Sequence, residues 1–156
     1  MILVLQRVTR AAVRVAGETV GEIGTGLLVL GCVEPADDEN AVDEAARKTA
    51  EMRIFGDAEG RMNRDVREAG GAILAVSQFT LGADLSRGRR PGFEGAAKPE
   101  AAEPLFARYV AALRAYGVRV ETGRFRAMME VELVNDGPVT FHWRSKRPAE
   151  GGGQGR

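Results

Sequence analysis

The sequence predicts a single α/β (α+β) domain with one mixed, twisted β-sheet and two main helices. Three observations predict this class. Strand-like runs outnumber helical patterns, and both helical patterns stand between strands. The 156 residues suit one domain. A hydrophobic share of 44% is enough for a folded core, so residues 1–144 are expected to fold and the polar, Gly-rich residues 145–156 to form a disordered tail.

The first part of the chain alternates strand patterns with glycine turns. Residues 1–15 are rich in aliphatic and β-branched side chains, which favours a strand. Gly17 turns the chain into a second strand over residues 18–23. Residues 27–33 are apolar without alternation, which is typical of a central strand that is covered on both faces.

Two helices are predicted from their spacing and their caps. The first begins at Asp37 or Asp38, whose carboxylates suit an N-cap, and extends to about Met52. The second covers residues 100–116, where apolar side chains recur at helical spacing and indicate a core-facing stripe. Gly117 is the residue type that commonly follows a helix C-terminus.

The remaining strands are predicted over residues 72–76, 118–121 and 127–134, with a last one ending near residue 143. Residues 82–99 between them form a long irregular loop that carries Arg87, Arg89, Arg90 and Lys98. Long loops are more often functional than idle. Two interpretations of this one stay open: a solvated loop whose cations pair with Asp84 and Glu94, or a docking surface for RNA.

The segment Val134–Phe141 organises the C-terminal half of the chain. Asn135-Asp136-Gly137 between two strand-like runs favours a hairpin turn. The following Pro138 makes a second interpretation possible, because Gly lacks a Cβ and Pro tolerates a cis peptide bond. The pair then forms a rigid corner whose carbonyl groups point outward and act as a steric gauge.

Composition excludes several classes of protein. Basic and acidic residues balance at 22 each, which argues against indiscriminate nucleic-acid binding. The lone Cys32 excludes an internal disulfide, and no apolar run approaches the length of a membrane span. We expect a soluble, cytoplasmic protein that does not contact a membrane. The chain has no Walker or dinucleotide motif, and one His and one Cys make a metal site improbable, so no cofactor and no metal are expected.

Ser77-Gln78-Phe79-Thr80 is the best candidate for chemistry. Hydroxyl, amide and backbone N–H groups follow directly after a buried strand, where they can line a site. The alternative is an ordinary turn that these hydroxyls cap. The only histidine, His142, would have to serve any Ser-His-acid triad, and no general base stands near Ser77 or Thr80 in sequence.

Several of these segments together resemble the D-aminoacyl-tRNA deacylase (D-tyrosyl-tRNA deacylase) family. The Ser-Gln-Phe-Thr and Asn-x-Gly-Pro-Val-Thr motifs are quite specific to it, and the resemblance spans nearly all of residues 1–141. The matching segments are residues 1–8, 52–55, 60–63, 76–84, 88–93 and 133–140.

The resemblance implies hydrolysis of the ester that joins a D-amino acid, or glycine, to the 3′-terminal adenosine of tRNA. It also implies a homodimer whose sheets pack across the interface, with a Gly-cisPro corner of one subunit meeting the Ser-Gln-Phe-Thr motif of the other. The implied catalytic residues are Ser77, Gln78, Phe79 and Thr80. The implied substrate-binding residues are Gly137, Pro138, Arg7 and Asn135.

The implied mechanism fits the residues. Corner carbonyls exclude an L side chain, the adenosine 2′-hydroxyl activates water, and N–H groups at residues 79 and 80 stabilise the oxyanion. A nucleophilic Thr80 ranks second, because nothing in the sequence activates it. A non-catalytic tRNA-binding module and an esterase for other small substrates remain alternatives. Phe125-Arg126-Ala127 departs from the family, which often has Gly at the middle position.

Overall fold

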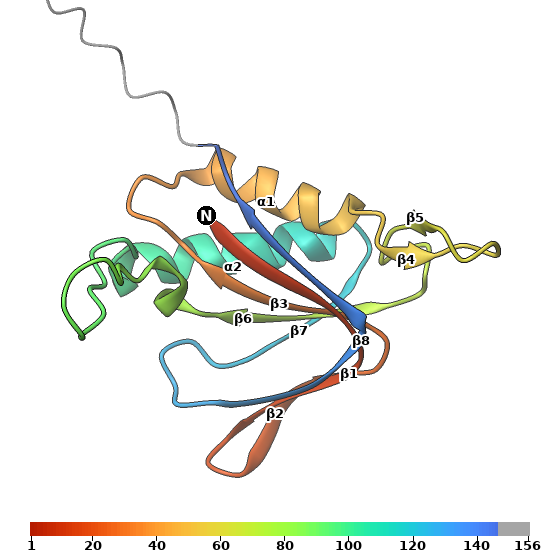
Figure 1. Ribbon diagram of the computed structural model, residues 1–156, viewed down its shortest axis with the longest axis horizontal. Coiled ribbons are helices and arrows are strands. Elements are labelled where there is room, and N and C mark those ends of the chain that lie inside the picture. Colours follow the sequence, from red (N-terminus) through yellow and green to blue (C-terminus); the bar gives the residue numbers. More distant parts are fainter. Residues whose placement is uncertain (147–156) are drawn as a thin grey trace, which may run out of the picture.

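The computed structural model describes residues 1–146 and confirms one α/β domain with two helices and a mixed, twisted sheet (Figure 1). The strands are β1 (Ile2–Val15), β2 (Glu18–Ile23), β3 (Gly26–Cys32), β4 (Phe55–Gly56), β5 (Met62–Arg64), β6 (Ala72–Ser77), β7 (Arg119–Thr122) and β8 (Glu130–Arg144). The helices are α1 (Glu39–Glu51), α2 (Pro99–Ala115) and the short 3₁₀ helix η1 (Phe79–Gly82).

The main sheet has the order β2-β1-β3-β6-β7, and β8 pairs with β1 in addition. β1 is antiparallel to β2, β3 and β8, whereas β3, β6 and β7 are mutually parallel. β3 is the buried central strand that its unbroken apolar pattern predicts. The sheet curls until β2 approaches β7: a Cβ built on Gly21 would lie 2.4 Å from the carbonyl oxygen of Thr122.

Both main helices cover the same face of the sheet and form the larger core with it (Figure 1). Asp38 caps α1 as predicted, since its carboxylate accepts a hydrogen bond from the N–H of Ala41 at 2.9 Å. The helices are joined through a buried contact in which the hydroxyls of Thr49 and Tyr109 lie 2.8 Å apart. Burial raises the pKa of the Tyr109 phenol, so this hydroxyl stays neutral.

The predicted hairpin at residues 134–141 is wrong. Residues 130–144 form one strand, β8, and both of its halves run antiparallel to β1. Val8 lies opposite Asn135 and Gln6 opposite Thr140, so the residues between Asn135 and Thr140 bulge from the ladder without reversing the chain. The long strand β1 explains this result, because it offers a continuous partner to both halves.

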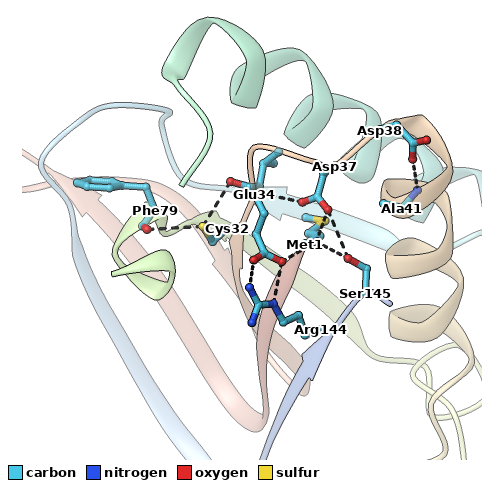
Figure 2. A network of polar contacts seen from close by, with 10 residues as sticks. Met1, Cys32, Glu34, Asp37, Asp38, Ala41, Phe79, Arg144 and Ser145 are labelled. Atoms are coloured by element: carbon cyan, nitrogen blue, oxygen red, sulfur yellow. Dashed lines mark hydrogen bonds and ion pairs between the residues drawn. The ribbon is translucent and has the colours of Figure 1, made fainter. Parts of the chain in front are cut away.

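A buried polar network ties the start of β1 to the end of β8 (Figure 2). The α-ammonium of Met1 contacts the carboxylates of Glu34 and Asp37 and the hydroxyl of Ser145. Arg144 binds the Glu34 carboxylate through two nitrogens. Ser145 is thus buried and bonded, which corrects its predicted place in a disordered tail; residues 147–156 lie outside the described residues.

Burial raises the pKa of Glu34, but the hydrogen bond from Arg144 and the nearby α-ammonium outweigh it, and the pKa is lowered overall. β4 and β5 form a small antiparallel pair. Among residues 1–146, no helix is long and apolar enough to span a membrane.

Glu34→Gln is expected to lower the free energy of unfolding by about 2–3 kcal/mol at pH 7, because Arg144 loses its buried carboxylate partner and the Met1 α-ammonium keeps only the carboxylate of Asp37. A lowered carboxyl pKa stabilises the fold above the unfolded-state pKa, and that contribution is lost as the pH falls through the folded-state pKa. The difference between the two proteins should therefore shrink below the ordinary value of 4.5.

Urea titrations at a series of pH values and one protein concentration measure this difference. Glu51→Gln is the matched control, since Glu51 forms only an exposed i,i+4 pair with Arg47 and its loss should change stability by less than about 0.5 kcal/mol. Equal stability of the Glu34 and Glu51 variants at pH 7 would contradict the assignment.

Candidate functional site

The corner at Gly137–Pro138 stands out from β8 and is exposed in the single chain. The peptide bond between Gly137 and Pro138 is cis, which is the isomer that the resemblance implies. Gly137 has a φ of 131°, a region that L side chains rarely adopt. A Cβ at this position would also lie 2.7 Å from Val139 Cγ2, so both the backbone and the space require glycine.

Two polar side chains hold the corner in place. Asn135 closes the bulge from within: its Oδ1 accepts a hydrogen bond from the N–H of Val139 at 3.0 Å, and its Nδ2 donates to Thr140 Oγ1 at 2.9 Å. Arg7 holds the bulge from β1, since its Nε donates to the carbonyl oxygen of Asp136 at 3.2 Å. Both groups are engaged within the protein.

Arg7 also links the corner to the segment that follows α1. Its Nη1 donates to the carbonyl oxygen of Ile54 at 2.8 Å, and its Nε lies 3.3 Å from Asp136 Oδ2. Only 17% of the Arg7 side chain is exposed. A guanidinium can serve several oxygen acceptors at once because its N–H groups form a fixed fork, which a lysine ammonium cannot reproduce.

The Ser77–Thr80 segment lies at the carboxyl end of β6, where the chain passes into η1. Gln78 N–H donates to the Gly31 carbonyl at 2.8 Å, and Gln78 Nε2 donates to Thr80 Oγ1 at 2.5 Å. Cys32 Sγ approaches the carbonyl of Phe79 at 3.5 Å and joins this segment to the buried network (Figure 2). Burial raises the pKa of the Cys32 thiol, which therefore stays neutral.

The backbone of η1 offers free hydrogen-bond donors. Among the residues that the structure describes, the N–H groups of Phe79 and Thr80 have no acceptor, whereas their neighbours Gln78 and Leu81 each donate to a backbone carbonyl. The Phe79 side chain is 56% exposed. Two adjacent N–H groups without acceptors can bind an oxygen that develops negative charge.

A cavity of about 320 Å³ lies between α2 and the carboxyl ends of β6 and β7. Ser77 lines it from β6, and Arg124 and Phe125 line it from the loop after β7. The helix contributes Glu103, Phe106, Ala107, Val110 and Arg114. Its volume and mixed apolar and polar lining suit a ligand the size of a nucleoside.

Sequence patterns did not indicate the α2 side of this cavity. Phe106 belongs to the apolar stripe that was assigned wholly to the core, and Val110 was not singled out. Glu103 and Arg114 lie on the same face at helical spacing, and this pair of charges at the ends of an apolar stripe is the signal that could have indicated a cavity.

Within one chain, the corner and the Ser77–Thr80 segment lie at opposite ends of the sheet. Asn135 is opposite Val8, Val8 is opposite Gly26, and Gly26 is opposite Ala72, so the corner is level with the start of β6. Ser77 is the last residue of β6, roughly 17 Å farther along the strand direction.

His142 does not complete a triad with Ser77. It lies on β8 opposite Val4, Val4 is opposite Leu30 on β3, and Leu30 is opposite Val76 on β6. Three interstrand spacings, roughly 14 Å, therefore separate His142 from the strand that carries Ser77. The side chain of His142 is exposed. Among residues 1–146, no group of three or more His, Cys, Asp or Glu side chains could hold a metal ion.

The loop after β7 contains the departure from the family pattern. Arg126 has a φ of 63°, the left-handed region in which L residues are strained. Glycine at this position would adopt the same backbone without strain. The neighbouring Gly123 packs against Met129, whose sulfur also accepts a hydrogen bond from the N–H of Arg124 at 3.4 Å.

Comparison with known proteins identifies relatives along nearly the whole chain. Residues 4–144 match the sequence model of a family described as "D-Tyr-tRNA(Tyr) deacylase". The chain is 64% identical over 138 residues to a protein of Symbiobacterium thermophilum named D-aminoacyl-tRNA deacylase; the match covers 88% of this chain and 91% of that protein.

Two solved structures share the fold. One, described as a "c-Myc DNA Unwinding Element Binding Protein", superposes with a TM-score of 0.88 at 37% identity and covers 94% of this chain and 99% of its own. The other, described as a probable eukaryotic D-amino acid tRNA deacylase, has a TM-score of 0.79 at 20% identity. It covers 91% of this chain and 97% of its own. The second likeness concerns the fold alone.

Arg126→Gly is expected to raise the free energy of unfolding by about 0.5–1 kcal/mol. Relief of the left-handed conformation is worth about 1–2 kcal/mol, and the greater freedom of glycine in the unfolded chain removes part of that gain. Thermal or urea unfolding measures the change. Arg126→Ala is the control, because it removes the side chain but keeps the strain; a similar gain from alanine would disprove the backbone explanation.

Proposed function

The chain belongs to the D-Tyr-tRNA(Tyr) deacylase family, and on that premise we propose that it hydrolyses the ester bond of D-aminoacyl-tRNA, releasing the free D-amino acid and tRNA. The observation that carries the proposal is the pair of elements just described. One is the glycine–proline corner held by Arg7, and the other is the pair of free N–H groups at the end of β6.

The two elements act together only in a homodimer. Because they lie at opposite ends of the sheet within one chain, the corner of one subunit completes the site that the Ser77–Thr80 segment forms in the other. A two-fold axis would create two such sites at once, since each surface patch meets the same patch of its partner. This arrangement explains why the corner is exposed in the single chain.

The corner selects the D configuration by exclusion. The carbonyl oxygens of Gly137 and Pro138 occupy the space that an L side chain needs and accept hydrogen bonds from the substrate's α-amino group. A D side chain points away from the corner and towards solvent. Arg7 and Asn135 keep the carbonyls in place, so we assign them to positioning the corner. Specificity of this kind arises from a clash with the wrong substrate.

The chemistry needs no general base from the protein. The adenosine 2′-hydroxyl lies beside the ester and activates the attacking water, and its fixed position supplies the proximity that a side-chain base would otherwise supply. The N–H groups of Phe79 and Thr80 stabilise the oxyanion of the tetrahedral intermediate, at about 3 kcal/mol for each donor. The cavity beside Ser77 holds the terminal adenosine.

A non-catalytic tRNA-binding module is the second candidate, and exposed arginines in residues 82–98 are the feature that favours it. A protein that binds tRNA but leaves D-aminoacyl-tRNA intact would support that alternative. An esterase for unrelated small substrates would not depend on the 2′-hydroxyl, so turnover of a substrate ending in 2′-deoxyadenosine would indicate it.

The proposed function is tested by comparing the hydrolysis of D-tyrosyl-, L-tyrosyl- and glycyl-tRNA. We expect rapid release of D-tyrosine, release of glycine, and release of L-tyrosine at least a hundredfold slower, because a gauge that works by exclusion cannot reject a missing side chain. Equal rates on the D and L esters would contradict the proposal, and stable glycyl-tRNA would contradict exclusion as the sole basis of selection.

Thr80→Ala is expected to retain kcat within about tenfold of the unaltered protein. The side chain lacks an activating base and accepts a hydrogen bond from Gln78, whereas the N–H of residue 80 is unchanged in the variant. Single-turnover kinetics on D-tyrosyl-tRNA measure the effect. Loss of all activity in a folded variant that still binds tRNA would instead establish Thr80 as the nucleophile.

A further inference from the structure

The arginines without partners are concentrated in one part of the molecule. Most arginine side chains in residues 1–146 bind a carboxylate or a backbone carbonyl. Six have no hydrogen bond or ion pair within this part of the chain: Arg53, Arg87, Arg89, Arg90, Arg124 and Arg126. The last five, which we call the arginine rim, lie in two loops, residues 82–98 and 123–129, and all five are exposed.

The two loops leave the same end of the sheet. Residues 82–98 follow β6 through η1, and residues 123–129 follow β7, which is parallel to β6. Figure 1 shows both loops at the end of the sheet that carries η1, opposite the end that carries β4 and β5. The arginine rim therefore lies at the end of the sheet that carries the Ser77–Thr80 segment, and one of its members, Arg124, lines the adjoining cavity.

Nearby carboxylates do not neutralise the rim. The two loops carry six basic and two acidic side chains in a chain whose net charge is zero. Asp84 accepts a hydrogen bond from the N–H of Ser86 at 2.8 Å and forms no ion pair among the described residues. Of the two interpretations of this loop, the one in which its cations pair with Asp84 and Glu94 finds no ion pair to support it among the described residues.

The longer loop is fixed against the site. The backbones of Asp84 and Gly92 exchange hydrogen bonds of 2.8 and 2.9 Å, and the rings of Phe79 and Phe93 meet edge to face at 5.2 Å. Gly82 and Gly95 pack so closely that a Cβ on Gly95 would lie 2.3 Å from the Gly82 carbonyl oxygen. These contacts hold the base of the loop that carries Arg87, Arg89 and Arg90 against η1.

We propose that the arginine rim binds the phosphates of the 3′ strand of the tRNA acceptor arm and so positions the terminal ester over the Ser77–Thr80 segment. The inference rests on the proposed function and adds to it the part of the substrate that the rim contacts. Phosphates suit the rim because guanidinium groups bind them with paired N–H donors, and the 3′ strand carries a phosphate at each of the nucleotides that lead to the ester.

The exposed apolar side chains among the arginines agree with a single-stranded partner. Leu85 is 73% exposed and Phe93 is 43% exposed, and both lie in the same loop as three of the rim arginines. Surfaces that bind single-stranded nucleic acid combine cationic side chains along the backbone with apolar or aromatic groups against the bases.

The test compares two substrates that carry the same ester bond. D-tyrosyl-tRNA carries the phosphates, whereas 3′-O-D-tyrosyl-adenosine carries the same ester and none. The triple variant Arg87→Gln/Arg89→Gln/Arg90→Gln should lose about tenfold or more in kcat/KM on the tRNA and keep its rate on the nucleoside ester. Each lost phosphate contact also reduces the salt dependence, so the slope of log(kcat/KM) against log[salt] should flatten by about two to three.

Two further variants serve as controls. Arg47→Gln/Lys48→Gln/Arg61→Gln removes the same charge from exposed positions on α1 and near β5, away from η1, and should leave both substrates unaffected. Arg87→Lys/Arg89→Lys/Arg90→Lys keeps the charge but not the paired N–H donors, so it should keep the salt dependence and lose less of the rate on tRNA than the glutamine variant.

Each remaining outcome counts against the inference. An equal loss on both substrates would mean that the loop only shapes the catalytic centre, and an unchanged rate on tRNA would mean that the rim binds no phosphate. If the unaltered protein hydrolyses neither ester, the proposed function itself fails, and the inference fails with it. Inactivity of the unaltered protein is distinguishable from the two outcomes above, because it is seen before any substitution is made.

Discussion

The contact that the site depends on most is the one between Arg7 and the backbone beside the Gly137–Pro138 corner. Arg7 donates to the Asp136 carbonyl and to the Ile54 carbonyl from one largely buried guanidinium. Because it projects from β1, which pairs with three other strands, the corner is fixed relative to the whole sheet. A steric gauge needs this rigidity, since a displacement of about 1 Å would admit the wrong hand of amino acid.

The sheet topology sets a second constraint on function. Parallel β6 and β7 bring the free N–H groups of η1, the cavity under α2 and the arginine rim to one end of the sheet. The antiparallel pairing of β1 with β8 leaves the corner level with the other end. The two elements to which we assign selection and catalysis are therefore separated within one chain, and our proposal unites them between two chains of a symmetric pair.

Local patterns predicted most of the fold and part of the site. The unbroken apolar run of β3 indicated a central strand, and the carboxylate of Asp38 indicated the start of α1.

The hairpin predicted at Asn135-Asp136-Gly137 does not form, although its local turn chemistry is ideal. The length of β1 decides the outcome, because β1 pairs with both halves of β8. Ser145 was placed in the tail because its contact with Met1 joins the two ends of the described chain, a pairing that no local pattern can indicate. The Ser77–Thr80 segment was found from sequence, but the helical side of its cavity was not, since a stripe of apolar residues looks the same whether it faces a core or a cavity.

The central claim is that the corner of one chain completes the site of another, and a mixed-dimer complementation assay tests it most directly. One variant, Thr80→Pro, removes an N–H donor of η1; the other, Gly137→Val, places a branched side chain on the corner. Each should be nearly inactive on D-tyrosyl-tRNA by itself. After the two are dissociated and reassociated together, half of the dimers should contain one intact site built from the unaltered parts of both chains, so the mixture should recover about a quarter of the specific activity of the unaltered protein. A mixture that stays as inactive as its parents would show that the two elements act within one chain or not together at all.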